Sequence, residues 1–165
     1  EEGKVIKSKD SIKYFGAMLY KTGRIDSEIG AKIGIAKQDF RTLMQIWGHA
    51  NISKRRKLEL YRSLIVSKLL YGLQTVWLSK VLRQRIDAFH CACVRRIMGI
   101  PHSYISRVTN ADVLKEAKSV PLHRILLQQQ LLYYGRIRRI QGHPCQEFLQ
   151  PNIRKRRKGR PYLSW

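Results

Sequence analysis

Acidic residues are scarce in this chain. Its 165 residues include 33 Lys and Arg but only 11 Asp and Glu, which gives a formal net charge of +22. The acids are also dispersed, and the only adjacent pair is Glu1-Glu2 at the start of the sequence. Two-metal nucleotidyl transfer needs carboxylates gathered around Mg²⁺. The sequence therefore predicts no catalytic residue, no metal site and no cofactor held by this chain.

Long apolar runs are absent as well. No uncharged apolar stretch reaches the ~18 residues of a transmembrane helix, so we expect no membrane span. The most apolar segment, residues 61–78, is interrupted by Arg62 and Lys68 and predicts a core helix. The first residues contain no apolar signal region and do not begin with Met. We therefore expect this chain to be part of a longer polypeptide.

Cysteine is equally sparse. Cys91, Cys93 and Cys145 make a poor disulfide framework for a chain of this size. A zinc site that combines these thiols with His90 and His143 is one interpretation. Cys91 and Cys93 would point to different sides of a helix, however, and no Cys-x₂-Cys pair occurs. Buried apolar thiols are the default interpretation, in a reducing compartment that we expect to be nuclear and cytoplasmic.

Positive charge, by contrast, is abundant and clustered. A chain with this charge repels itself unless a polyanion neutralises it. Taken singly, each cluster is typical of a solvated helix face. Taken jointly, with few acids to pair, the clusters indicate binding to a nucleic-acid backbone, and nothing in them indicates readout of base edges. The predicted nucleic-acid-binding residues are Lys54, Arg55, Arg56, Lys57, Arg95, Arg96, Arg136, Arg138, Arg139, Arg154, Lys155, Arg156, Arg157, Lys158 and Arg160.

Hydrophobic periodicity predicts a mainly α fold. Residues 11–23 alternate and end at Thr22-Gly23, as in a short strand or hairpin. Apolar residues then recur at steps of three and four, which is the helical period. The sequence predicts a small N-terminal β-hairpin (1–23), a bundle of about five helices (24–142) and a basic, flexible C-terminal tail (143–165). The predicted helices span about residues 25–47, 53–77, 82–97, 109–118 and 121–140.

Local signals mark several helix ends. Ser53 is a predicted N-cap, and Thr109 with Asp112 three residues later resembles a capping box. Gly99 and Pro101 predict the end of the third helix, and Pro121 suits the first turn of the last one.

Six segments form an ordered series along the chain. They are KYFGAMLYKTGRIDSEI (13–29), KLELYRSLIVSKLLYGLQTVWL (57–78), AFHCACVRRIMGI (88–100), RVTNADVL (107–114), LLYYGRIRRIQGHP (131–144) and KGRPYLSW (158–165). In this order and spacing they resemble the C-terminal part of the reverse transcriptases of non-LTR (LINE-type) retrotransposons. The resemblance runs from about Ile12 to the last residue. Each segment is weak evidence alone, but the series is specific.

The resemblance implies roles for particular residues. Lys13, Tyr14, Phe15 and Gly16 are similar to the Tyr-Leu-Gly hairpin that grips the primer end in these enzymes. The helices that follow would be the thumb and its extension, which hold the template–primer duplex. Residues 54–57 and 95–96 would contact the backbone of that duplex.

The resemblance also implies parts that this chain lacks. In the family, the fingers and palm come earlier and contain paired aspartates that bind metal, whereas no Asp-Asp occurs here. Mg²⁺ is therefore expected only in the missing palm of an RNA-directed DNA polymerase. The expected partners are RNA, RNA–DNA or DNA duplex, and the fingers and palm of the same polypeptide. Phe15 in place of Leu, and Leu73-Gln74 in place of Ser-Glu, depart from the family pattern.

Two other functions stay open at this point. One is a free-standing basic nucleic-acid-binding or architectural protein derived from such an element. Gly-Arg-Pro within RKRRKGRPYLSW (154–165) is similar to a minor-groove hook, and the segment also fits a nuclear-localisation cluster. The other is a basic helical protein at a membrane surface, which is less favoured because the cationic stripes lack an opposite Trp/Phe face.

Overall fold

The computed structural model describes residues 10–14, 17–21, 25–142 and 144–149. Helices dominate this part of the chain, and two short strands precede them, so the predicted fold class is confirmed. The elements are β1 (Ser11–Tyr14), β2 (Ala17–Tyr20), α1 (Asp26–His49), α2 (Lys54–Tyr61), the π-helical segment η1 (Arg62–Val66), α3 (Ser67–Leu70), the 3₁₀ turn η2 (Leu73–Thr75), α4 (Lys80–Met98), α5 (Ser103–Ser106), α6 (Asn110–Glu116), α7 (Leu122–Arg139) and the 3₁₀ segment η3 (Pro144–Leu149).

The N-terminal strands form the predicted hairpin. β1 pairs with β2 in an antiparallel two-stranded sheet, in which Ser11 lies opposite Tyr20 and Tyr14 opposite Ala17. The backbone N–H of Lys21 donates to the carbonyl of Asp10 at 2.9 Å, which extends the ladder by one bond. Two strands alone bury little, so this hairpin is the least self-sufficient part of the fold.

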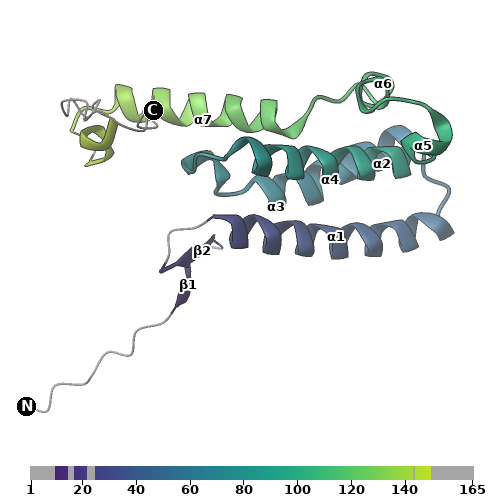
Figure 1. Cartoon of the computed structure of the whole chain (residues 1–165), viewed down its shortest axis with the longest axis horizontal. Coiled ribbons are helices and arrows are strands. Elements are labelled where there is room, and N and C mark those ends of the chain that lie inside the picture. The colour runs from purple at the N-terminus through teal and green to yellow at the C-terminus, as the bar shows by residue number, and fades with distance from the viewer. Residues whose placement is uncertain (1–9, 15–16, 22–24, 143, 150–165) are drawn as a thin grey trace, which may run out of the picture.

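The helices stack in three layers (Figure 1). α1 forms one outer layer, α2, η1, α3 and α4 form the middle layer, and α7 forms the other outer layer. Apolar side chains recur along α1 at the predicted steps and face the middle layer. They are Ile29, Ile33, Ala36, Phe40 and Trp47. They join Tyr61, Ile65 and Val94 in one hydrophobic cluster, whose burial holds the bundle together.

Side-chain caps set several of the helix ends. Ser53 Oγ accepts from the backbone N–H of Arg56 at 3.3 Å and begins α2. Thr109 and Asp112 form the complete capping box at the start of α6. Gly99, at φ +73°, ends α4 in the left-handed conformation that favours glycine. These three predicted boundaries are confirmed.

The helix predicted to span about 53–77 is wrong after Leu70. The chain passes through η1 and ends its helical course at Leu70. Gly72 then adopts φ +79°, a conformation that breaks a right-handed helix, and the turn directs Leu73 into the core while Tyr71 stays exposed. Two smaller differences are the additional helix α5 and the position of Pro121, which is the N-cap of α7 rather than a residue of its first turn.

Candidate nucleic-acid interface

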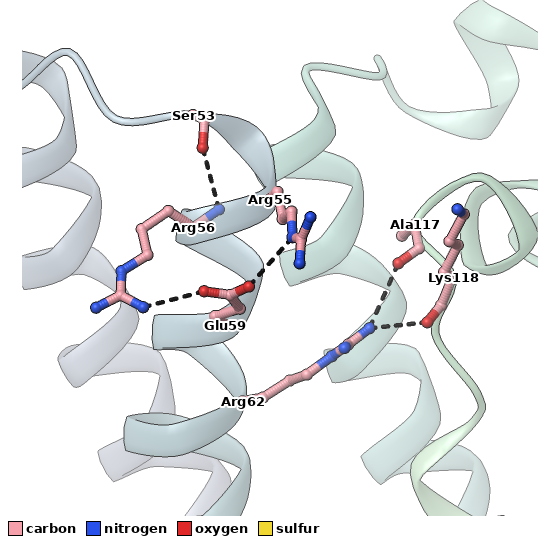
Figure 2. A network of polar contacts seen from close by, with 7 residues as sticks. All are labelled: Ser53, Arg55, Arg56, Glu59, Arg62, Ala117 and Lys118. Carbon is pink, nitrogen blue, oxygen red and sulfur yellow. Dashed lines mark hydrogen bonds and ion pairs between the residues drawn. The ribbon is translucent and has the colours of Figure 1, made fainter.

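The predicted cluster at residues 54–57 forms the first turn of α2. Lys54, Arg55 and Arg56 are exposed, and Lys57 is half-buried. Arg55 Nε lies 3.3 Å from Glu59 Oε1 and Arg56 Nη1 lies 3.0 Å from Oε2, as Figure 2 shows. Hydrogen bonds from Arg56 and then Arg55 lower the pKa of Glu59. The Glu59 carboxylate thus offsets one of the four positive charges in this turn. The other three lie at the start of α2, where the helix dipole also attracts anions.

These two ion pairs do not block the surface. Exposed arginine–carboxylate pairs add little to the stability of a protein, so a phosphate can replace Glu59 as the partner of either guanidinium. The cluster is therefore compatible with the predicted backbone contact.

Arg62, one turn further along, has a structural role that the sequence did not indicate. Its Nη2 donates to the carbonyls of Ala117 at 3.4 Å and Lys118 at 2.9 Å (Figure 2). These carbonyls follow α6, where Lys118 takes a positive φ of +47°. Arg62 thus fastens η1 to the connection between α6 and α7.

The prediction that Arg95 contacts a phosphate is wrong. Its side chain is only 6% exposed. Nε and Nη2 donate to Asn110 Oδ1 at 3.1 and 3.0 Å, Nη1 donates to the Pro101 carbonyl at 3.1 Å, and Nη2 also donates to the Val108 carbonyl at 2.6 Å. The guanidinium therefore holds the loop that connects α4 to α6, and four of its five N–H donors are engaged there. The adjacent Arg96 is exposed.

Arg96 belongs to a strip of positive charge between α1 and α4. The two helices lie side by side and run in the same direction (Figure 1). Near the start of the strip, a Cβ built on Gly30 would lie 3.9 Å from Arg85 Nη2. Near its other end, burial raises the pKa of the Cys93 thiol to about 12, and the charges of Arg96 and Lys37 oppose that rise. Both cations therefore lie near this thiol.

We define the α1–α4 basic strip as Lys37, Arg41, Arg85 and Arg96. All four side chains are exposed. Lys37 and Arg41 are one turn apart on α1, and Arg85 and Arg96 are three turns apart on α4. The interval from Arg85 to Arg96 covers ~16 Å of helix axis, which equals the rise of about five nucleotides in a duplex strand.

Small residues leave this strip open to a polyanion. Gly34 and Ala92 are exposed, and nothing lies within 4 Å of a Cβ built on Gly34. Asp26 lies in the first turn of α1, one turn before Gly30, and Glu28 lies 3.8 Å from Lys32, whereas the two acids further along these helices pair with residues of other elements. Asp39 pairs with Lys68 at 2.6 Å, and Asp87 pairs with His123 of α7. The sequence analysis did not identify Lys37, Arg41 and Arg85. Lys37 and Arg41 follow Gly30 and Gly34 at helical steps, which was a signal, whereas nothing in the sequence placed Arg85 beside them.

The three arginines near the end of α7 form a separate group. Arg136, Arg138 and Arg139 are exposed. They lie at the opposite end of the bundle from the start of α2 and the end of α4 (Figure 1). Cations in the last turn of a helix are stabilised by its dipole, which accounts for their placement without a ligand. The structure therefore does not bring them together with residues 54–57.

Two predicted groups lie wholly or partly outside the described residues. Lys13 and Tyr14 are in β1, whereas Phe15 and Gly16 are not described. The tail residues Arg154, Lys155, Arg156, Arg157, Lys158 and Arg160 also lie outside the described residues. The primer-grip and tail assignments stay predictions.

The buried polar groups form a structural network rather than a reaction site. The Tyr61 hydroxyl lies 3.0 Å from His90 Nδ1, and His90 Nε2 lies 3.2 Å from Ser119 Oγ. Burial lowers the pKa of His90 from 6.5 to about 4 and raises the pKa of Tyr61. Both groups are therefore neutral near pH 7, and they join the middle layer to the chain before α7.

Asp87 and His123 form a second link between helices. Asp87 Oδ2 lies 2.5 Å from His123 Nδ1, and its Oδ1 accepts from the His123 backbone N–H at 3.0 Å. Asp87 of α4 therefore caps the start of α7 from another helix. Within the described ranges, no three His, Cys, Asp or Glu side chains gather in a way that could hold a metal ion.

No described helix is long and apolar enough to cross a membrane. Comparison with known proteins identifies no matching family model, curated protein or solved structure.

Proposed function

We propose that this chain is a nucleic-acid-binding helical unit that holds a duplex by its phosphate backbone without reading bases. The observation that carries the proposal is the α1–α4 basic strip, four exposed cations along two parallel helices whose acids Asp39 and Asp87 pair with residues of other elements. The cluster at 54–57 adds exposed cations at the end of the bundle where Arg96 lies (Figure 1).

We further propose that the unit is the thumb and C-terminal region of a LINE-type RNA-directed DNA polymerase. The resemblance of the six ordered segments supports this assignment, as does the order of a small hairpin followed by helices. In such an enzyme the unit would keep the RNA–DNA hybrid in place while the palm carries out the chemistry.

The salt dependence of duplex binding tests the backbone model. Each phosphate contact releases condensed cations, so log affinity falls against log salt with a slope of about −0.9 per contact. We expect a steep negative slope for the whole chain, measured by fluorescence anisotropy with RNA–DNA and DNA duplexes of unrelated sequence. R41Q/R96Q should flatten that slope by about 2, equally for each sequence.

The matched control removes the same charge from lysines that already lie beside acids. Lys68 pairs with Asp39, and Lys115 lies three residues after Asp112, whose pKa is lowered by hydrogen bonds from Thr109 and, to a smaller extent, by the charge of Lys115. K68Q/K115Q should therefore change the slope much less than R41Q/R96Q. A flat slope for the unmodified chain would reject the backbone model, and equal effects of the two double variants would remove the strip from it.

The upstream reading frame separates the polymerase from a free-standing binding protein. A Tyr-x-Asp-Asp motif within about one domain, ~100–200 residues before Glu1, would support the polymerase assignment. A nearby start codon with no palm between would instead favour an independent architectural protein, for which duplex binding is still expected.

A further inference from the structure

α7 exposes a second apolar face on the side away from the core. Its inner face buries Leu122, Leu126 and Ile137. On the outer side Leu131 and Leu132 are 61% and 63% exposed, and Leu127 is also exposed. A helix that is apolar on two faces normally buries both of them, because exposed leucine surface is costly in water. The outer leucines therefore point to a partner.

The outer leucines lie in an open hollow with positive charge at both ends. We define the α7 outer face as Arg124, Leu127, Leu131, Leu132, Gly135 and Arg139, which line this hollow. A Cβ on Gly135 would lie 3.3 Å from Arg139 Nη1, so the missing side chain leaves room for the guanidinium. Residues 122–139 contain no acid.

We infer that an acidic amphipathic helix of a protein partner docks on the α7 outer face. Apolar residues of the partner, spaced three and four apart, would cover the leucines. Its carboxylates would meet Arg124 and Arg139, which have no acidic neighbour on α7. A second copy of this chain fits poorly, because two copies would bring arginine against arginine and oppose two charges of +22.

This face is separate from the α1–α4 basic strip. α7 and α1 are the two outer layers of the bundle, with the middle layer between them (Figure 1). A duplex on the strip and a helix on α7 can therefore be bound together. The docking inference stands or falls independently of duplex binding.

A pair of synthetic peptides tests the inference on the full chain. The first has Leu at helical steps of three and four with Glu between, and the second has the same composition in scrambled order. Both carry the same net charge, so only the first offers an apolar face. We expect it to bind at least about tenfold more tightly, measured by anisotropy, because each half-buried leucine contributes about tenfold in affinity.

Exposed-residue variants locate the site. L131Q/L132Q should abolish the preference for the patterned peptide, while L64Q should retain it, since Leu64 is 51% exposed on η1. Circular dichroism checks that the helices persist. The inference is overturned if both peptides bind alike, or if L64Q removes the preference as well. It is also overturned if the patterned peptide has no advantage while vesicles of phosphatidylserine and phosphatidylcholine bind and L131Q/L132Q releases them, which would make this a lipid-binding face.

Discussion

His90 is a neutral imidazole in the core, and this gives the protein a pH-dependent stability. Its pKa in the folded chain is about 4, below the ordinary 6.5. As the pH falls from about 6.5, the unfolded chain takes up the proton first, so the free energy of unfolding decreases until about pH 4. The full loss is about 3 kcal/mol. Urea unfolding at a series of pH values measures it.

The variant H90Q should lose this part of the pH dependence, since Gln keeps polar atoms but does not titrate. H102Q is the matched control because His102 is exposed at the start of α5. It should keep the slope between pH 6.5 and 4 that the unmodified chain shows. An H90Q protein with that slope unchanged would assign the effect to other groups.

Arg95 and Arg96 show what sequence could not distinguish at the level of single residues. Both lie in one basic pair on a helix with a clear apolar stripe. Arg95 is buried because the chain after α4 places the carbonyls of Pro101 and Val108, and the side chain of Asn110, around it. Arg62 is similar, with acceptors at residues 117 and 118. Such roles depend on tertiary partners, whereas the caps at Ser53 and Thr109 depend on neighbours within three residues and were predictable.

At the scale of elements, α1 contains a glycine whose replacement should stabilise the protein. Gly34 is exposed in the helix interior, and a Cβ there would have nothing within 4 Å. G34A should raise the free energy of unfolding by about 0.5–1 kcal/mol, because Ala loses less backbone entropy in a helix. Chemical denaturation measures the change.

Replacing Gly99 should have the opposite effect from replacing Gly34. It has equal room but a φ of +73°, so an L side chain there is strained. G99A should lower the free energy of unfolding by about 1–2 kcal/mol. If both substitutions stabilised the protein, the left-handed end of α4 would not be a constraint.

Long helices were predictable from the sequence and short irregular segments were not. The stripe from Ile29 to Trp47 repeats over the whole of α1, so the core-facing side was evident. In residues 61–78 eleven of eighteen positions are hydrophobic and they continue past residue 70, so periodicity could not reveal where the helix ends. From the sequence, Gly72 could lie within a helix or in a turn. Its positive φ and the burial of Leu73 in the structure show that it lies in a turn. α5 is four residues long and has no buried residue to signal it.

The distribution of charge emerges only at the scale of the whole molecule. Lys37 and Arg85 are distant in sequence, and neither belongs to a run of cations. They share a surface because α1 packs beside α4 in the same direction. The net charge alone predicted nucleic acid as the partner. The residues of the strip could be identified only from the packing of α1 beside α4. The arginines at the end of α7 were also predicted to bind nucleic acid, and they lie at the opposite end of the bundle from the start of α2 (Figure 1).

The net charge of +22 should make the Tm of the free chain depend on salt concentration. Bound nucleic acid should reverse the direction of that dependence. The described residues pair Lys or Arg with only three acids, Glu28, Asp39 and Glu59, so repulsion outweighs attraction. Salt screens that repulsion, with a Debye length of about 10 Å at 0.1 M and about 3 Å at 1 M. The Tm of the free chain should therefore rise with NaCl.

A duplex should have the opposite dependence on salt. At low salt, free duplex at about 100 times its Kd stabilises the folded chain by about 2.7 kcal/mol, and the Tm rises accordingly. At high salt the affinity is lost and the two melting curves converge. An analogue of the same sequence with an uncharged backbone should leave the Tm unchanged at every salt concentration.

A Tm of the free chain that falls with NaCl would mean that ion pairs outweigh repulsion. A duplex effect that persists at high salt would mean that contacts other than phosphates hold the nucleic acid.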